Sequence, residues 1–190
     1  MSAARAPSAR VAPAASVHIG RRHDNWVVTL LATAASTYAL DAFAIAVGAL
    51  LAASGLLAGL DGPLLIAFLA ATYAVWGVGL RVSLAANWAL LSCTGASTNV
   101  LSKAAHDIAR ARHAGPRVRR FAASSGYVVT ELAKELPYYA SASGATLLSN
   151  TVSTGDAIVF LAGTNLGAAL YEYGLARATR TYLRRRAPSR

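Results

Sequence analysis

The sequence contains a single cysteine, Cys93, among its 190 residues, so no intramolecular disulfide can stabilise the fold. Packing alone must therefore hold the chain together. We expect Cys93 to be a small buried apolar residue, because free cysteines are among the residue types most often found inside proteins. We assign it no redox or nucleophilic role.

Charged residues are also few. They make up 14% of the chain, against 55% hydrophobic residues, and the mean hydropathy is +0.43. A soluble domain is typically about 25% charged, so this composition indicates a single domain in a membrane. Acidic residues are scarcer than basic ones, 8 against 18, which gives a formal net charge of +10. No aromatic platform accompanies the central basic patch at residues 103–120, so the charge does not indicate nucleic-acid binding.

Catalytic, metal-binding and cofactor-binding motifs are missing from the sequence. The four histidines, at positions 18, 23, 106 and 113, do not have the spacing of a metal site. His106 and Asp107 are adjacent, and neighbours on a helix point to different faces, so we expect no catalytic pair there. There is no nucleophile elbow, phosphate-binding loop or dinucleotide fingerprint. The sequence therefore predicts no cofactor and no metal, and it favours a protein that is not an enzyme.

Two nearly unbroken apolar stretches, residues 26–60 and 64–80, dominate the first half of the chain. A run of about 18 or more apolar residues can cross a hydrocarbon core about 30 Å thick, because a helix satisfies its own backbone hydrogen bonds there. We expect one helix from Trp26 to about Leu51 and a second from Pro63 to about Leu80. The sequence Asp-Gly-Pro at 61–63 predicts the turn between them.

Polar residues accumulate after the second apolar stretch, which predicts that this helix leaves the bilayer and continues as a basic amphipathic arm. Residues 94–99 combine Gly, Ser, Thr and Asn, which favour caps, so we expect a break there. Ser97 or Asn99 would then cap a short helix that ends before Gly115. We expect the arm to bind anionic lipid headgroups or a protein partner through Arg110, Arg112, Arg117, Arg119 and Arg120.

The second half of the chain is less apolar. Residues 121–150 include charged residues and Pro137, whereas residues 157–176 are apolar apart from Asn165 and Glu172. The basic residues favour counting both as spans, because four crossings put the basic patches at 5–22, 103–120 and 177–190 on one side, as the positive-inside rule requires. The sequence predicts an all-α integral membrane protein with four transmembrane helices in two hairpins and both termini cytoplasmic. We expect the bacterial inner membrane, with an organellar inner membrane as the alternative.

The domain organisation follows from these spans. The first residues lack the apolar core of a secretory signal, which leaves a disordered basic tail or an organellar transit segment. The predicted parts are a basic N-terminal tail (1–24), a first transmembrane hairpin (25–93), a basic cytoplasmic arm (94–120), a second transmembrane hairpin (121–180) and a basic C-terminal tail (181–190).

A short internal repeat suggests how the two hairpins are related. Ile-Ala-Phe-Leu-Ala-Ala-Thr at 66–72 and Ile-Val-Phe-Leu-Ala-Gly-Thr at 158–164 are identical at five of seven positions. Each copy opens the second helix of a predicted hairpin. A duplicated hairpin would give a parallel repeat about an axis along the membrane normal, and chance similarity between apolar segments is the alternative.

Several polar residues are expected at membrane depth. Helix geometry places Asp41 about 22 Å, and Lys134 about 20 Å, from the cytoplasmic ends of their helices. We expect these two to pair, with the carboxylates on either side of Lys134 competing for it. This polar layer would bind or relay an ion, a proton or a polar substrate; the alternatives are an interhelical clamp and an interfacial position for residues 131–135. The layer comprises Asp41, Glu131, Lys134, Glu135, Asn165 and Glu172, the last of which we expect to form an interfacial ion pair with Arg177.

Small residues predict where helices pack closely. Gly163, Gly167 and Gly174 share one face of the last helix, and Ala140 and Gly144 offer a similar face on the third. We expect packing within the second hairpin or between protomers. The leading hypothesis is therefore a small oligomeric membrane protein that transports an ion or small solute. The alternative is a non-transporting assembly or scaffold subunit, and a membrane enzyme comes third.

Overall fold

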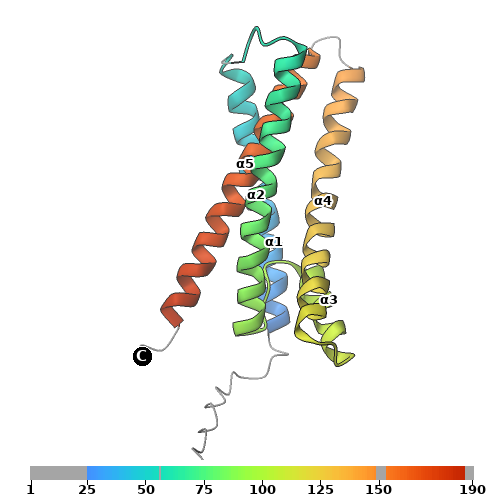
Figure 1. The fold of residues 1–190 in the computed structure, drawn as a ribbon. Helices are drawn as coiled ribbons and strands as arrows, with labels where there is room; N and C mark the ends of the chain where they lie inside the picture. Colours follow the sequence, from blue (N-terminus) through green and yellow to red (C-terminus); the bar gives the residue numbers. More distant parts are fainter. Residues whose placement is uncertain (1–24, 56, 149–152, 187–190) are drawn as a thin grey trace, which may run out of the picture.

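Five helices make up the protein in the computed structural model, which describes residues 25–55, 57–148 and 153–186, and of residues 137–148 the backbone alone. No strand occurs within these ranges. The four long helices run along a common axis, and the short α3 lies beside the start of α4 (Figure 1). The predicted all-α class is confirmed. The helices are α1 (Asn25–Ala53), α2 (Gly62–Thr94), α3 (Val100–Ala111), α4 (Pro116–Leu148) and α5 (Thr154–Arg186).

The helix ends follow the predicted punctuation. Asp61 is the N-cap of α2 and its side chain accepts a hydrogen bond from the backbone N–H of Leu64, at 3.1 Å. Gly95 ends α2 in the left-handed conformation, with φ 72°, which glycine adopts without strain. Asn99 then caps α3 by accepting from the N–H of Ser102, at 2.9 Å. The predicted turn at 61–63 and the break at 94–99 are both confirmed.

Two ends of the molecule differ in character. The loop end carries residues 54–61, which join α1 to α2, and the start of α5. The basic end carries α3, the start of α4 and the last turn of α5 (Figure 1). The predictions made for residues 1–24 and 187–190 lie outside the described residues.

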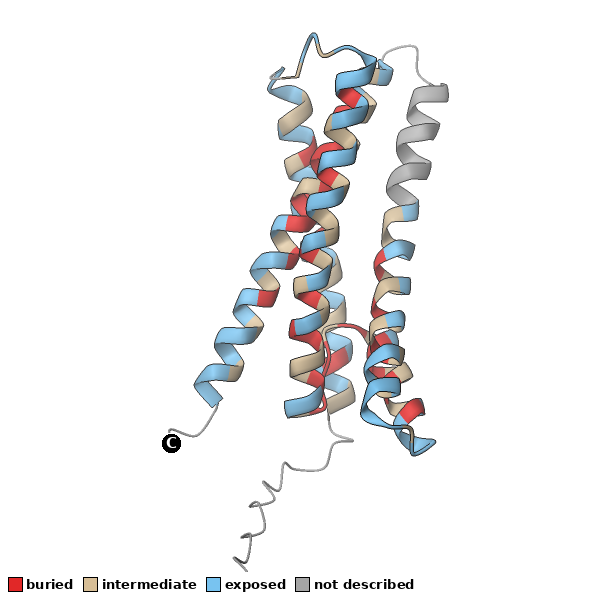
Figure 2. Ribbon diagram, viewed as in Figure 1, coloured by how far each residue is buried: buried red, intermediate tan, exposed pale blue. Residues whose placement is uncertain are grey.

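Helices α1 and α2 are the two described helices that are long and apolar enough to cross a membrane. The core helix of a soluble protein can pass the same test, but such a helix is mostly buried. Here only 17% of the most apolar 18-residue window of each helix is buried. Large apolar side chains point outward instead, with Tyr38 exposed to 78%, Leu50 to 71% and Leu31 to 66% (Figure 2). Exposed apolar surface of this extent is typical of a face that contacts a membrane or a protein partner.

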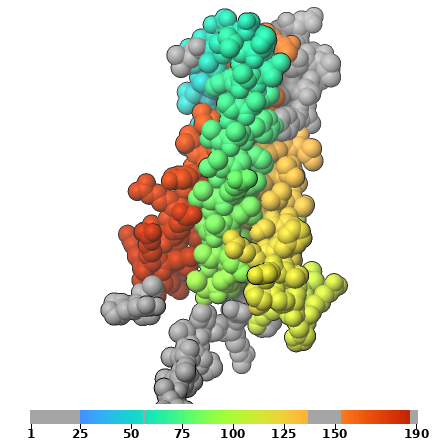
Figure 3. Space-filling model, in the orientation of Figure 1, coloured from blue at the N-terminus to red at the C-terminus, as the bar shows by residue number. Residues whose placement is uncertain are grey.

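Helix α5 holds the bundle together. It packs against both α1 and α2, which make little contact with each other, so the helices joined by the 54–61 loop do not form a packed hairpin. Figure 3 shows α2 along the whole visible face, with α5 on one side and α4 with α3 on the other. Helices α1 and α2 are adjacent in the sequence, but each packs mainly against α5 and not against the other.

Close approach between α1 and α5 depends on small residues. A methyl group added at Gly163 would lie 2.6 Å from Gly48 Cα, and one at Gly167 would lie 2.8 Å from Ala44 Cα. These two glycines face α1, and not the second hairpin or another protomer. Gly174 meets nothing within 4 Å of an added methyl group. Ala140 and Gly144 lie outside the residues whose side chains are described.

The two copies of the internal repeat occupy corresponding places. Each begins one turn or so after the loop end of its helix, and α2 and α5 run parallel (Figure 1). The last residue of each copy is a buried threonine whose hydroxyl donates three residues back: Thr72 to Leu69 O at 2.7 Å, and Thr164 to Leu161 O at 2.8 Å. The two segments thus share local geometry as well as sequence.

Candidate functional site

A cluster of carboxyl groups lies between α1, α4 and α5, about midway along the bundle. Glu131 and Glu172 are 5% and 2% exposed. Lys134 Nζ lies 3.0 Å from Glu131 Oε1, and the two residues of this ion pair are about one turn apart on α4. The predicted pairing of Asp41 with Lys134 is therefore wrong. Lys134 pairs instead with Glu131, one of the two carboxylates that were predicted to compete for it.

Glu172 is held by a neutral hydroxyl. The phenol of Tyr127 on α4 donates to Glu172 Oε2 at 3.1 Å, and the phenol oxygen of Tyr127 lies 2.8 Å from the Ser83 hydroxyl of α2. This hydrogen-bonded chain ties three helices together through side chains that are almost fully buried. The expected ion pair with Arg177 is wrong: Arg177 is exposed and belongs to none of the ion pairs in the described part of the chain.

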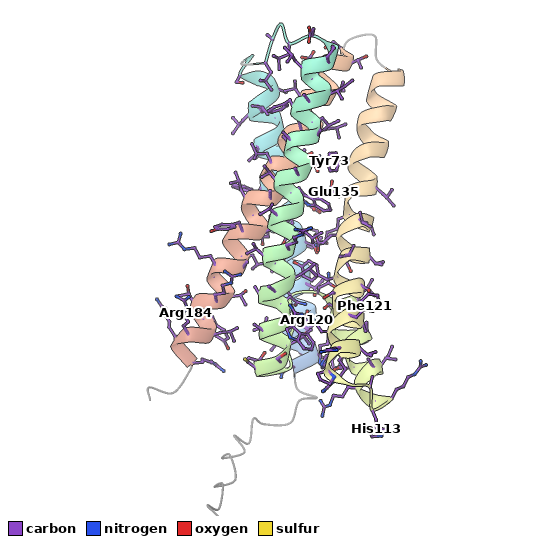
Figure 4. All side chains as sticks on the ribbon, viewed as in Figure 1. Tyr73, His113, Arg120, Phe121, Glu135 and Arg184 are labelled. Atoms are coloured by element: carbon purple, nitrogen blue, oxygen red, sulfur yellow. The ribbon has the colours of Figure 1, made fainter. Side chains whose placement is uncertain are left out.

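Asp41 and Glu135 complete the carboxyl cluster. Asp41 Oδ1 is buried and has no hydrogen-bond partner among the described residues. Glu135 lies within electrostatic range of Asp41, Glu131 and Lys134, and Glu172 within range of the last two. Figure 4 shows Glu135 on the side of α4 that faces α2. Glu131, Glu135 and Glu172 therefore share Lys134, and Asp41 joins the cluster through Glu135.

Asn165 lies apart from this cluster. It sits on α5 two turns, or about 10 Å, nearer the loop end than Glu172. Its Nδ2 donates to Leu161 O of the same helix at 2.9 Å, and the side chain is 1% exposed. The polar layer of the sequence analysis thus divides into a cluster of five charged residues and a separate asparagine.

A second polar cluster fills the bundle toward the basic end. Asn87 Oδ1 accepts from the Ser97 hydroxyl at 2.6 Å, and its Nδ2 donates to the Ser102 hydroxyl at 2.8 Å. The Ser97 N–H donates to Thr29 of α1, at 3.1 Å, and the Thr130 hydroxyl of α4 donates to the Asn99 side chain, at 3.2 Å. Residues 95–99 therefore bind four helices through hydrogen bonds.

Lys103 is the most deeply buried cation, at 2% exposure. Its Nζ donates to Gly95 O and to Asp107 Oδ2, both at 2.9 Å, and lies 4.8 Å from the centroid of the Trp26 ring. These three partners replace the water that a buried ammonium loses.

Asp107 joins Lys103 to His106. Burial acts to raise the pKa of Asp107, but the hydrogen bonds and charges of Lys103 and His106 outweigh it and hold this pKa below its ordinary value. His106 Nδ1 lies 3.1 Å from Asp107 Oδ1, so the expectation that these adjacent side chains do not meet was wrong. The ring of His106 also contacts Trp88 edge-on, with centroids 5.9 Å apart.

The basic arm presents its arginines to the outside. Arg119 is the half-buried one, and its Nε has no hydrogen-bond partner among the described residues. Arg120 and His113 lie at the same end of the molecule as Arg184 (Figure 4). The exposed members are Arg110, Arg112, Arg117 and Arg120. Cys93, at this end of α2, is exposed, which corrects the expectation of a buried thiol.

Sequence reasoning missed Tyr127 and Ser83, which hold Glu172. The available signal was a spacing: Tyr127 and Glu131 are four residues apart on α4, and Ser83 and Asn87 are four apart on α2, so each pair shares a helix face. In the described part of the chain, no three His, Cys, Asp or Glu side chains converge as metal ligands do. Comparisons with protein-family models, curated proteins and solved structures found no match to this chain.

Proposed function

We propose that the protein spans a membrane four times, with both termini cytoplasmic, and moves protons or monovalent cations through its helical bundle, working as an oligomer. The observation that carries the proposal is the charge of the central cluster. The cluster contains four carboxyl groups, of Asp41, Glu131, Glu135 and Glu172, and among the described residues one cation, Lys134, which leaves a charge of −3 if all are ionised. Uncompensated charge at this depth is costly, so protons or a bound cation must balance it.

The membrane location is supported by exposed apolar surface on α1 and α2 and by the arrangement of charge. Basic residues gather at one end, whereas the connections at 54–61 and 149–153 contain no Lys or Arg. Helix α5 is less apolar than a lone span, and its buried residues between Val159 and Ala176 pack against α1 and α2, where small residues allow closer approach than large apolar ones. Helices α4 and α5 have 33 residues each, about 50 Å, which is enough to cross.

A hydrophilic route leads to the cluster from the basic end. The second polar cluster reaches Asn87, and Ser83 lies one turn further along the same face of α2. Ser83 bonds Tyr127, and Tyr127 bonds Glu172. Hydroxyl groups donate and accept, so this chain can pass a proton to a carboxylate without a charged intermediate residue.

Flux through reconstituted vesicles tests the proposal. Full-length protein in liposomes should carry protons or a monovalent cation, reported by a pH-sensitive or cation-sensitive dye. Glu172→Gln keeps an acceptor for Tyr127 and removes the ionisable group, so the flux should fall to that of empty vesicles while the unfolding temperature stays close to wild type. Asp156→Asn, an exposed acidic position on the same helix, should leave the flux intact.

Wild-type vesicles that conduct no better than empty ones would overturn the transport proposal. The exposed arginines would then favour the second candidate, an assembly subunit that binds anionic lipid or a protein partner. Topology is tested separately, in a Cys93→Ser background. Cysteines placed at Ser153 and Arg117 should react with an impermeant label from opposite sides of the membrane, and labelling of both from one side would contradict four spans.

A further inference from the structure

A pocket of about 420 Å³ opens at the basic end, between the first turn of α1 and α3. It is separate from the carboxyl cluster, and Arg110 is the one arginine of the basic arm that lines it. Its lining residues are Trp26, Gly95, Lys103, His106, Asp107, Arg110 and Ala111.

The charges around this pocket favour an anion. Two basic side chains, Lys103 and Arg110, line the pocket together with one carboxylate, Asp107. Lys103 is fixed in place by its bonds to Gly95 O and Asp107. Arg110 is exposed and has no hydrogen-bond or ion-pair partner among the described residues, so all of its donors are available to a ligand. A free guanidinium matches the oxygens of a phosphate group in a two-point contact.

The surface beside the pocket indicates where the phosphate comes from. Leu30 is one turn from Trp26 on the same face of α1 and is 54% exposed. A ligand held by its phosphate at Arg110 therefore meets apolar protein surface on α1, at Trp26 and Leu30, as an acyl chain would require.

We propose that this pocket binds the phosphate group of an anionic phospholipid, with Arg110 contacting the phosphate, Lys103 supplying a fixed positive charge and Trp26 forming the apolar wall. The inference rests on the membrane location proposed above and does not depend on transport. An anionic glycerophosphate in solution presents the same phosphate chemistry, and the experiment distinguishes the two sources.

The test uses full-length protein purified in a neutral detergent. Phosphatidylglycerol, phosphatidylcholine, glycerol phosphate and inorganic phosphate are titrated in turn, and bound molecules are counted by native mass spectrometry. Arg110→Gln should weaken phosphatidylglycerol binding about fivefold, the factor expected for one basic residue near an anionic surface. Arg184→Gln is the control: it removes an exposed charge at the same end of the molecule, on α5, that does not line the pocket.

Each outcome decides the matter. Tight binding of phosphatidylglycerol alone, weakened by Arg110→Gln and not by Arg184→Gln, supports the lipid site. Glycerol phosphate or inorganic phosphate binding with the same dependence on Arg110 supports the phosphate pocket and assigns it a soluble ligand. Equal losses in both variants would show attraction to the basic surface as a whole and overturn the pocket. Equal affinity for phosphatidylcholine would overturn the selection for anionic ligands. Flux is not measured, so failure here leaves the transport proposal standing.

Discussion

The loop end and the basic end of the bundle are held together in opposite ways. Toward the loop end, α1 and α5 approach until Gly48 and Gly163 are in backbone contact, and the interface exists because side chains are missing. Toward the basic end, Asn87 and Ser97 make buried hydrogen bonds, and the interface exists because polar side chains are present. The contact between glycines has no group that titrates or can lose a hydrogen-bond partner, but it has no room for an added atom. The hydrogen-bonded contact is stable only when every buried polar group has its partner.

This difference separates framework from function. Contact between glycines fixes the distance between helices and offers no group that binds or titrates. Every ionisable side chain that the described part of the chain buries, by contrast, lies from the middle of the bundle toward the basic end: Lys103, His106, Tyr127, Glu131 and Glu172. The proposed ion route and the phosphate pocket both lie in that half.

The largest effect is expected from Asn87→Leu, which breaks the hydrogen-bonded half. Leucine has the same number of side-chain heavy atoms and the same branch at Cγ, but it leaves the Ser97 hydroxyl without its acceptor and Ser102 without its donor. Buried groups that lose a partner cost about 1–3 kcal/mol each, so we expect a loss of roughly 3 kcal/mol in the free energy of unfolding. Chemical unfolding of the purified protein in detergent measures it.

The control for this change is Cys93→Ser, in the last turns of the same helix. Cys93 is exposed, so the unfolding free energy should move by less than about 0.5 kcal/mol. If Asn87→Leu unfolds no more easily than Cys93→Ser, the network does not stabilise the basic end, and the contrast between the two ends fails.

A smaller effect is expected from Gly163→Ala, which breaks the half built on missing side chains. The new methyl group would lie 2.6 Å from Gly48 Cα, and backbone cannot rotate away as a side chain can, so the helices must separate. Overpacking of this kind costs about 1–3 kcal/mol. Thermal unfolding in detergent should show the loss.

Gly174→Ala supplies the opposite sign on the same helix. An added methyl group there meets nothing within 4 Å, and replacing a helical glycine by alanine stabilises by about 0.5–1 kcal/mol. Equal behaviour of the two variants would mean that α5 does not pack on α1 through Gly163.

Local structure was predictable from the sequence, and tertiary pairing was not. The helix ends at Asp61, Gly95 and Asn99 could be predicted, because the backbone of a cap or of a left-handed residue depends on a few neighbouring atoms. The face formed by Gly163 and Gly167 was also visible, but a small-residue face fits any helix that can approach it. Its partner is α1 because α5 lies between α1 and α2, an arrangement that no local pattern encodes.

The polar residues show the same limit. Charge and depth identified Glu131, Lys134 and Glu172, yet the partner of each depends on angles and distances between helices. Tyr127 was missed because a tyrosine in a half-apolar helix is compatible with packing, an interface or a hydrogen bond alike. His106 was expected to point away from Asp107, but rotation about the side-chain bonds brings the two groups to 3.1 Å.

The smallest effect concerns pH and sharpens the comparison, because the basic end alone is predicted to respond. The pKa of Asp107 is held below its ordinary value of 3.8 in the folded protein. A carboxyl with a lowered folded pKa stabilises the fold at pH values above the unfolded pKa, and this contribution is lost as pH falls through the lower, folded value. We therefore expect the basic end to lose less than about 1 kcal/mol of stability below about pH 4, since Asp107 is partly exposed and its ion pair is screened.

Hydrogen exchange, read segment by segment between pH 6 and pH 3, measures this loss after correction for the intrinsic pH dependence of exchange. Protection should fall in α3 and stay constant where α1 and α5 meet at Gly48 and Gly163, and Asp107→Asn should abolish the difference between the two regions. Protection that falls equally in both would mean that the acid response comes from the carboxyl cluster or the whole bundle rather than from Asp107.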